Sequence, residues 1–205
     1  MPYNHIIEIT KIVVILFYSV VLHEYAHGWM ADRLGDPTAK NMGRLTLNPF
    51  KHIDPFGTII LPILLFVMRS PVFLGWAKPV PVNFLNLRNP KRDMMWVGLA
   101  GPAVNITLAI FFGLLLKLPL SPFGEQFAKT AISINLVLAV FNLIPVPPLD
   151  GSRLLMGVLP RQMVIPYSRL EPIGIPIVMV LLYLGLFSAV VVPIVTFLEK
   201  ILGAS

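Results

Sequence analysis

Long apolar runs separated by short polar loops dominate the chain. A membrane-spanning helix needs about 20 mostly apolar residues. One run, at residues 6–29, reaches that length although it carries Glu8 and Lys11 near its start. Three further runs reach it more cleanly, at residues 94–116, 127–144 and 173–198. The pattern predicts an all-α integral membrane protein with about four spanning helices.

A fifth apolar stretch, residues 56–68, is too short for a full crossing. Basic loops flank it at residues 32–54 and 69–93. If the stretch crossed the membrane, these loops would lie on opposite faces, against the tendency of Lys and Arg to stay in the cytoplasm. We therefore expect a re-entrant or short helix here, with both loops and the loop after residue 144 on the cytoplasmic side.

Prolines alternate with valines in the second basic loop, where residues 78–83 read Lys-Pro-Val-Pro-Val-Asn. Proline interrupts helices and is tolerated at the edge of a sheet. The pattern therefore predicts an extended, Pro-rich edge segment between the apolar stretch and the next spanning helix.

Composition narrows the class of protein. Hydrophobic residues make up 56% and charged residues 13% of the chain, whereas soluble domains average about 45–50% and about 25%. The absence of cysteine excludes a cysteine protease, a zinc site with cysteine ligands and an iron–sulfur protein. The net charge of +6 fits cytoplasmic loops and lipid headgroups rather than a nucleic-acid partner. The length fits a single membrane-embedded domain over residues 1–205.

Ionisable residues cluster at the end of the first apolar run, although such groups are costly inside a membrane and therefore indicate function. They form the pattern His23-Glu24-Tyr25-Ala26-His27. Side chains four residues apart lie one turn above each other on a helix, so both imidazoles can face one metal ion. Glu24 lies about 100° around the helix from His23 and can take a proton from water at that metal. The alternative is that the histidines line a polar cavity or end the helix at the lipid headgroups.

A third ligand must come from elsewhere, because catalytic zinc usually takes three protein ligands and one water. A third histidine ten residues after His23 is excluded, because that position holds Arg33. A nearby glutamate is also excluded, because none occurs between Glu24 and Glu125. The remaining candidates are aspartates and the two other histidines.

Asp150 is the strongest of these candidates. It follows prolines at positions 145, 147 and 148 and precedes Gly151, and prolines end a helix and free its backbone groups. With a re-entrant stretch at 56–68, Asp150 and the two histidines lie at the same cytoplasmic depth. A simple turn aspartate is the alternative. His52 and Asp54 are competing ligands because they lie on the same face of the membrane.

Three blocks occur in order along the chain: His23-Glu24-Tyr25-Ala26-His27, a G-P-x-x-N element at residues 101–105, and residues 142–151 with their Asp-Gly end. Together they resemble the site-2 protease family of intramembrane zinc metalloproteases. The resemblance implies that His23, His27 and Asp150 bind one zinc ion and that Glu24 is the catalytic residue. It implies a zinc-dependent endopeptidase that hydrolyses peptide bonds in or near transmembrane segments of membrane proteins.

The resemblance also implies roles for Asn105 and Asn142, which look like the family's asparagines near the active site. They could hold the substrate backbone or an oxyanion, or they could form hydrogen bonds between helices. Residues 78–83 resemble a family segment that offers an extended edge to substrate. Many family members carry PDZ or CBS domains, so this chain resembles a minimal form. We expect it in a bacterial or archaeal inner membrane, with its site towards the cytoplasm.

Two other classes of protein compete with this interpretation. A catalytically inactive membrane protein of the same fold could bind zinc or substrate, but the intact Glu24 argues against it, because a structural site needs no base. A metal-ion transporter would carry further ionisable groups in its other spans. Residues 94–116 contain none, and residues 127–144 contain only Lys129.

Overall fold

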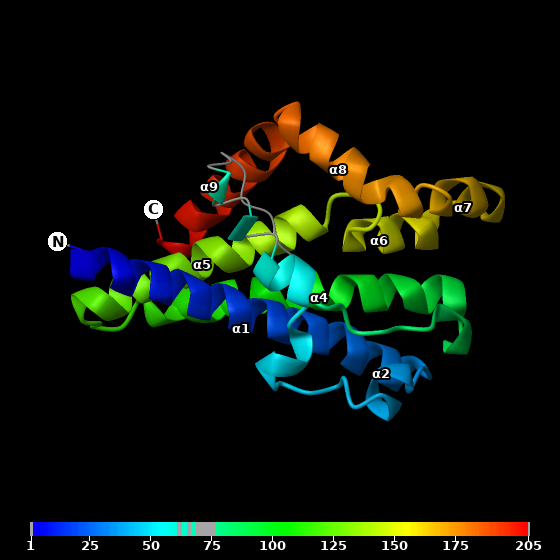
Figure 1. Ribbon diagram of the computed structural model, residues 1–205, viewed down its shortest axis with the longest axis horizontal. Coiled ribbons are helices and arrows are strands. Elements are labelled where there is room, and N and C mark those ends of the chain that lie inside the picture. The colour runs from blue at the N-terminus through cyan, green and yellow to red at the C-terminus, as the bar shows by residue number, and fades with distance from the viewer. Residues whose placement is uncertain (1, 61–62, 65–66, 69–76, 205) are drawn as a thin grey trace.

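The computed structural model describes residues 2–60, 63–64, 67–68 and 77–204, and the regular secondary structure in these residues is entirely helical (Figure 1). The expectation of an all-α protein is therefore confirmed for this part of the chain. In chain order, the elements are α1 (Pro2–Leu34), α2 (Thr38–Asn41), η1 (Pro49–His52), η2 (Pro55–Ile60), η3 (Phe84–Asn86), α4 (Pro90–Leu115), α5 (Pro122–Asn142), α6 (Asp150–Val158), α7 (Arg161–Ser168), η4 (Glu171–Ile173), α8 (Gly174–Tyr183), η5 (Phe187–Val191) and α9 (Val192–Leu202).

Helices α1, α4 and α5 pack against one another and form the centre of the molecule (Figure 1). Sequence signals fix where the latter two begin. Pro90 and Pro122 lie in the first turns of α4 and α5, where a missing N–H breaks no helical hydrogen bond. Ser121 caps α5 by accepting a hydrogen bond from Gly124 N (3.2 Å). Because α4 contacts α1, α5 and α6, it connects the elements that carry the candidate residues.

Two apolar clusters hold these helices together. One joins α4 and α5 to the last two helical elements and consists of Ala109, Ile132, Leu136, Val191 and Val195. The other joins the end of α1 to the start of α4 and to the chain after η3, through Ala31, Leu87 and Val97. The second cluster anchors the chain that precedes α4 beside the candidate site.

Three helical segments in the described residues are long and apolar enough to cross a membrane: His5–Leu34, Pro90–Leu115 and Arg161–Tyr183. The first two coincide with the predicted spans 6–29 and 94–116. The predicted span 127–144 is helical as α5, which has 21 residues, but it is not among the three. A count of four spans therefore stays a prediction.

The predicted span 173–198 is not one helix, and this expectation is wrong. The chain forms α8, turns at Gly185 and continues through η5, a short π-helix, into α9. Gly185 has a φ of 89°, a left-handed conformation that glycine adopts at little cost. Figure 1 shows the consequence, because α8 and α9 form an arch above α5 instead of a straight rod.

The short apolar stretch 56–68 falls partly outside the described residues. Its first part belongs to η2, a π-helix over Pro55–Ile60. Whether the stretch enters and leaves the membrane on one face stays a prediction.

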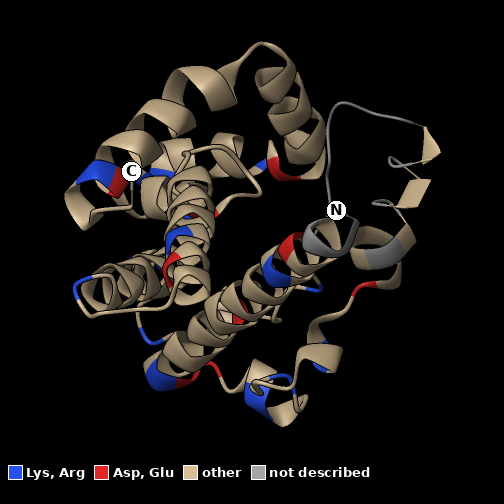
Figure 2. Ribbon diagram, turned by 90° about the vertical axis from the view of Figure 1, so that its left-hand side faces the viewer, with Lys and Arg blue, Asp and Glu red and all other residues tan. Residues whose placement is uncertain are grey.

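The surface of the helices is largely apolar. Figure 2 shows that Lys and Arg gather mainly near helix ends and in connecting loops, whereas most of the helical ribbon carries no charge. Large apolar side chains remain exposed along α1, among them Ile6, Ile9 and Val13. Lipid solvates such side chains where water does not. The structure is therefore that of an integral membrane protein.

The Pro-rich residues 78–83 run extended beside α1, and no strand is assigned in the described part of this loop. Their backbone is fastened at both ends. Lys78 N donates to the His52 carbonyl (2.9 Å), and Arg44 donates to the Lys78 carbonyl (3.0 Å). At the other end, Asn83 N donates to Asp36 Oδ2 (2.6 Å). The segment is thus held in place by side chains and carbonyls of the preceding loop.

The carboxylate of Asp36 anchors the Asn83 end of this extended segment. It is fully buried and accepts hydrogen bonds from Thr38, Asn83 and Asn86. Burial raises the pKa of this carboxyl, but the hydrogen bonds from Thr38, Asn86 and Asn83 outweigh it and hold the pKa below its ordinary value. Its contribution to stability is therefore fully present above about pH 4, the pKa of an unfolded aspartate, and is lost as the pH falls through the lower folded pKa.

Replacing Asp36 with alanine should destabilise the protein by at least about 2 kcal/mol, because several hydrogen bonds to a charged acceptor are lost. Unfolding in detergent should show this difference at pH 7, and the difference should shrink as the pH falls below about 4. Asp32→Ala is the control, because Asp32 pairs only loosely with Lys40, at 3.5 Å. Equal losses in the two variants, or a difference that persists at acidic pH, would contradict this account.

Candidate functional site

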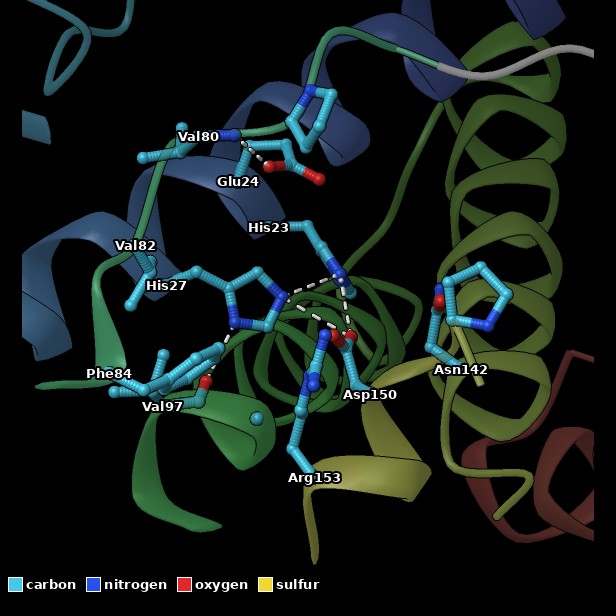
Figure 3. Close-up of a pocket in the computed structure, with 13 residues that line it drawn as sticks. His23, Glu24, His27, Val80, Val82, Phe84, Val97, Asn142, Asp150 and Arg153 are labelled. Carbon is cyan, nitrogen blue, oxygen red and sulfur yellow. Dashed lines mark hydrogen bonds and ion pairs between the residues drawn. The ribbon is translucent and has the colours of Figure 1, made fainter. Parts of the chain in front are cut away.

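Two histidines of α1 and one aspartate of α6 converge on a single point (Figure 3). His23 and His27 are one helical turn apart, and their Nε2 atoms are 3.0 Å apart. Asp150, the first residue of α6, places Oδ2 3.0 Å from His23 Nε2 and 3.2 Å from His27 Nε2. Among the described residues, these three form a group whose ligand atoms all lie within 4.8 Å of one another.

The hydrogen bonds behind the imidazoles determine which nitrogen is free. His27 Nδ1 donates to the Val97 carbonyl (2.7 Å) and His23 Nδ1 donates to Asn105 Oδ1 (2.6 Å). With hydrogen on Nδ1, each neutral ring presents the lone pair of Nε2 towards Asp150. Three acceptor atoms then face one another, and Asp150 Oδ2 is buried without a hydrogen-bond donor. A cation at the centre would relieve this repulsion, so the three residues fit a metal ion.

Glycines make room for this group. A Cβ at position 101 of α4 would lie 2.5 Å from His23 Nε2 and closer still to His27 Nε2. Gly101 therefore leaves open the space in which the imidazoles meet the carboxylate. A Cβ at Gly151 would overlap the Leu143 carbonyl, so glycine lets α6 begin close to the end of α5.

Glu24 lies beside the histidines but turns to a different neighbour. Its Oε2 accepts a hydrogen bond from Val80 N (2.7 Å), in the extended segment. Glu24 and the three converging residues line one cavity of about 300 Å³. The other walls come from the extended segment, η3, α4, α5, α6 and the turn between α5 and α6. The residues are Pro79, Val80, Val82, Phe84, Val97, Gly98, Asn142, Pro148 and Arg153.

The two asparagines predicted from the sequence lie in different places. Asn142 is in the cavity wall and donates to the Leu138 carbonyl of its own helix (2.9 Å). Asn105 is fully buried behind His23. The position of Asn142 suits contact with a substrate, whereas Asn105 contacts a histidine instead of the cavity.

The competing ligands His52 and Asp54 are not part of the converging group among the described residues. His52 is fully buried, and its Nε2 donates to the Thr46 carbonyl (2.8 Å). Asp54 accepts a hydrogen bond from Gly57 N (2.6 Å) and so caps the start of η2. Both residues thus stabilise the loop around η1 and η2.

Arg153 is a cavity residue that sequence reasoning missed. It forms an ion pair with Glu171, and its guanidinium lies 5.0 Å from the centre of the Phe84 ring. The residue thereby connects α6, η4 and η3. The available signal was its spacing, because residues three apart on a helix share a face and Arg153 lies three residues after Asp150.

An apolar helical bundle that encloses two histidines, an aspartate and a glutamate in one cavity defines a class: a membrane protein with an internal site suited to a metal ion. The chain belongs to peptidase family M50, whose model matches residues 11–131 and 124–185. The resemblance to the site-2 proteases is thereby confirmed at the level of the family, and the protein is a membrane metalloprotease by family.

Relatives from bacteria and archaea carry names that include zinc metalloprotease. YwhC of Bacillus subtilis (strain 168), named a candidate zinc metalloprotease, is 38% identical over 89% of this chain and 84% of its own length. Rip2 of Mycobacterium tuberculosis (strain H37Rv), also a candidate zinc metalloprotease, is 33% identical over 65% of this chain. Zinc metalloprotease MJ0392 of Methanocaldococcus jannaschii is 26% identical over 93% of this chain. The chain spans about half the length of the last two relatives. No solved structure matches it significantly.

Gly101→Ala should weaken metal binding without unfolding the protein, because the added methyl group displaces the two imidazoles. We expect the affinity for Zn²⁺, measured by competition with a chelator, to fall at least about tenfold. Gly113→Ala in the same helix is the matched control, since its Cβ would meet Leu202 at 3.2 Å and requires only a small adjustment. If both variants bind zinc like the wild type, Gly101 is not needed for the site.

Proposed function

We propose that this protein is a zinc-dependent endopeptidase that hydrolyses peptide bonds in or near transmembrane segments. The observation that carries the proposal is the convergence of His23 Nε2, His27 Nε2 and Asp150 Oδ2 beside Glu24 in one cavity. Two imidazoles and a carboxylate form a donor set that suits zinc, and three protein ligands leave a position open for reaction. The names of the relatives support the choice of zinc over other divalent metals.

In the proposed reaction, the metal ion and one carboxylate have separate roles. Bound zinc would supply a Lewis acid that polarises the scissile carbonyl. Glu24 takes the proton of the attacking water and passes it to the leaving amine. The hydrogen bond from Val80 N to Glu24 Oε2 holds the carboxylate at the cavity wall, and its second oxygen serves as the base. Asn142, in the opposite part of the wall, is placed to bind the substrate backbone or the developing oxyanion.

The substrate enters this cavity as an extended chain. A helical substrate must unwind first, because its carbonyls are occupied by hydrogen bonds within the helix. Pro79, Val80 and Val82 line one wall of the cavity, and the extended backbone of this segment is suited to lie alongside an unwound substrate. Pro79 and Pro81 have no N–H, and Val80 N is bonded to Glu24. The Pro79 carbonyl accepts from Arg44 (3.3 Å). The backbone groups that this wall offers to substrate are therefore the carbonyls of Val80, Pro81 and Val82 and the N–H of Val82.

The position of the site supports a cytoplasmic opening. His23 and His27 lie in the C-terminal half of α1, and the chain that follows carries the basic residues Arg33, Lys40 and Arg44. Basic residues favour the cytoplasmic side of a membrane. We therefore place the active site towards the cytoplasm, in the cell membrane of a bacterium or archaeon, as the sources of the relatives suggest.

Zinc content of the purified protein tests the ligand assignment. We expect about one zinc ion in the wild type and in Glu24→Gln, which keeps all three ligands, and loss of zinc from Asp150→Ala, which leaves only two. The wild type in liposomes should cleave members of a library of transmembrane peptides, detected by mass spectrometry, and Glu24→Gln should cleave none. Zinc retained by Asp150→Ala would overturn the ligand set. Zinc binding without cleavage of any peptide would instead favour a zinc-binding or substrate-binding protein of the same fold.

Val80→Pro should slow peptide cleavage by about tenfold or more, because it removes the N–H that holds the Glu24 carboxylate, and a hydrogen bond to a charged group contributes about 1.5–3 kcal/mol. Val80→Ala is the matched control, since it shortens the side chain but keeps the N–H. Zinc content should be unchanged in both variants. Equal rates for the proline and alanine variants would show that this hydrogen bond does not support the base.

A further inference from the structure

Two buried amide side chains lie behind the candidate metal site and have no part in the chemistry proposed above. Asn105 of α4 and Asn135 of α5 are both fully buried in the apolar centre of the bundle. Asn105 Nδ2 donates to Asn135 Oδ1 (2.8 Å). Asn105 Oδ1 in turn accepts from His23 Nδ1 (2.6 Å). The two amides therefore connect α5, through α4, to a candidate ligand on α1.

The hydrogen bond that Asn135 makes within its own helix determines which group donates in the bonds that link Asn135, Asn105 and His23. Asn135 Nδ2 donates to the Ala131 carbonyl (2.9 Å), and a carbonyl can only accept. Asn135 must therefore turn its oxygen towards Asn105, and the nitrogen of Asn105 donates to that oxygen. The Ser19 carbonyl, 3.5 Å from the same nitrogen of Asn105, favours the same orientation. The oxygen of Asn105 is then the atom left to face His23.

This orientation matters for metal binding. An oxygen facing His23 Nδ1 requires hydrogen on Nδ1 and leaves the Nε2 lone pair for a metal. If the Asn105 amide were reversed, its NH₂ group would face Nδ1, which would then have to accept. The imidazole hydrogen would move to Nε2, in the centre of the converging group, where it would block coordination.

We infer that Asn135 is a positioning residue for the metal ligand His23, acting through the amide of Asn105. The inference rests on the proposed function, because it requires His23 to be a metal ligand. Its geometry comes from spacing along α4, where Val97, Gly101 and Asn105 are four residues apart and share the face towards α1. Along this face, the Val97 carbonyl accepts from His27, Gly101 leaves space for the two imidazoles, and Asn105 accepts from His23.

A simpler role for the two asparagines is adhesion between helices, since buried amides hold membrane helices together. Adhesion and positioning differ in what they require of Asn135. Adhesion requires only that the two amides form a hydrogen bond, whichever of them donates. Positioning requires Asn135 to be the acceptor, because this fixes which end of the Asn105 amide faces His23. A carboxylate at position 105 removes this requirement, because both of its oxygens accept.

The test measures the affinity of the full-length protein in detergent for Zn²⁺, by competition with a chelator. Asn135→Leu should lower the affinity about tenfold, the lower end of the effect of residues that orient metal ligands. Asn105→Asp should also lower it, because the carboxylate then faces the Asn135 oxygen. The double variant Asn105→Asp/Asn135→Leu should bind zinc more tightly than either single variant, since the repulsion is gone and the carboxylate accepts from His23 in any orientation.

Cobalt spectroscopy, two further variants and checks of folding distinguish a positioning role from a loss of structure. The visible absorption of Co²⁺-loaded protein reports ligand geometry, and we expect it to change in Asn135→Leu and to return in the double variant. Thr130→Val, a change to an apolar residue on the same helix away from His23, is the control and should match the wild type. Asn135→Ala is prepared in parallel as a smaller replacement, with folding checked by circular dichroism and size-exclusion chromatography.

The outcomes separate the two proposals. A wild type that binds zinc, together with Asn135 variants of unchanged affinity, overturns the positioning role alone. A double variant no better than the single variants also overturns it and leaves adhesion as the role of the amides. A folded wild type that binds no zinc overturns the proposed function, and this inference falls with it.

Discussion

Three acceptor atoms held 3.0 to 3.2 Å apart inside an apolar bundle are the constraint on which this structure depends. The lone pairs of two imidazoles and a carboxylate repel one another, and apolar surroundings screen that repulsion poorly. They stay together because α1 and α6 are fixed by packing against the same helix, α4. Helix packing therefore sets the geometry of the site, and a metal ion would relieve a repulsion that the fold already imposes.

The turn between α5 and α6 places Asp150, and helices later in the chain hold this turn in position. The prolines that follow α5 keep the chain from continuing as a helix, as the sequence predicted, and the structure adds that Asp150 is the first residue of a new helix, α6. Later segments hold the turn from outside: Tyr167 Oη donates to the Pro145 carbonyl (2.8 Å), and Gly174 packs so closely against Pro147 that a Cβ would overlap its carbonyl. The helices that follow the site thus keep its third acceptor in place.

Local signals made most of the candidate site predictable, whereas one backbone conformation and the contacts between helices were missed. His23 and His27 follow from spacing on one helix, and Asp150 from prolines and matching depth. The arch at Gly185 was missed because an apolar run does not reveal a positive φ. Asn135 had a visible signal, an amide inside an apolar run. Its partner on another helix could not be identified without the packing of α4 against α5.

The surroundings explain why amides and a carbonyl, rather than carboxylates, lie behind the histidines. In soluble metal sites, the outer imidazole nitrogen often pairs with a carboxylate, which makes the ligand more basic. A second and third carboxylate buried between apolar helices would add charges that one divalent ion cannot balance, and each would carry a desolvation penalty of several kcal/mol. Asn105 and the Val97 carbonyl orient the same nitrogens without charge. The protein thus limits buried negative charge at the proposed metal position to Asp150 and leaves Glu24, the proposed base, at the wall of the cavity.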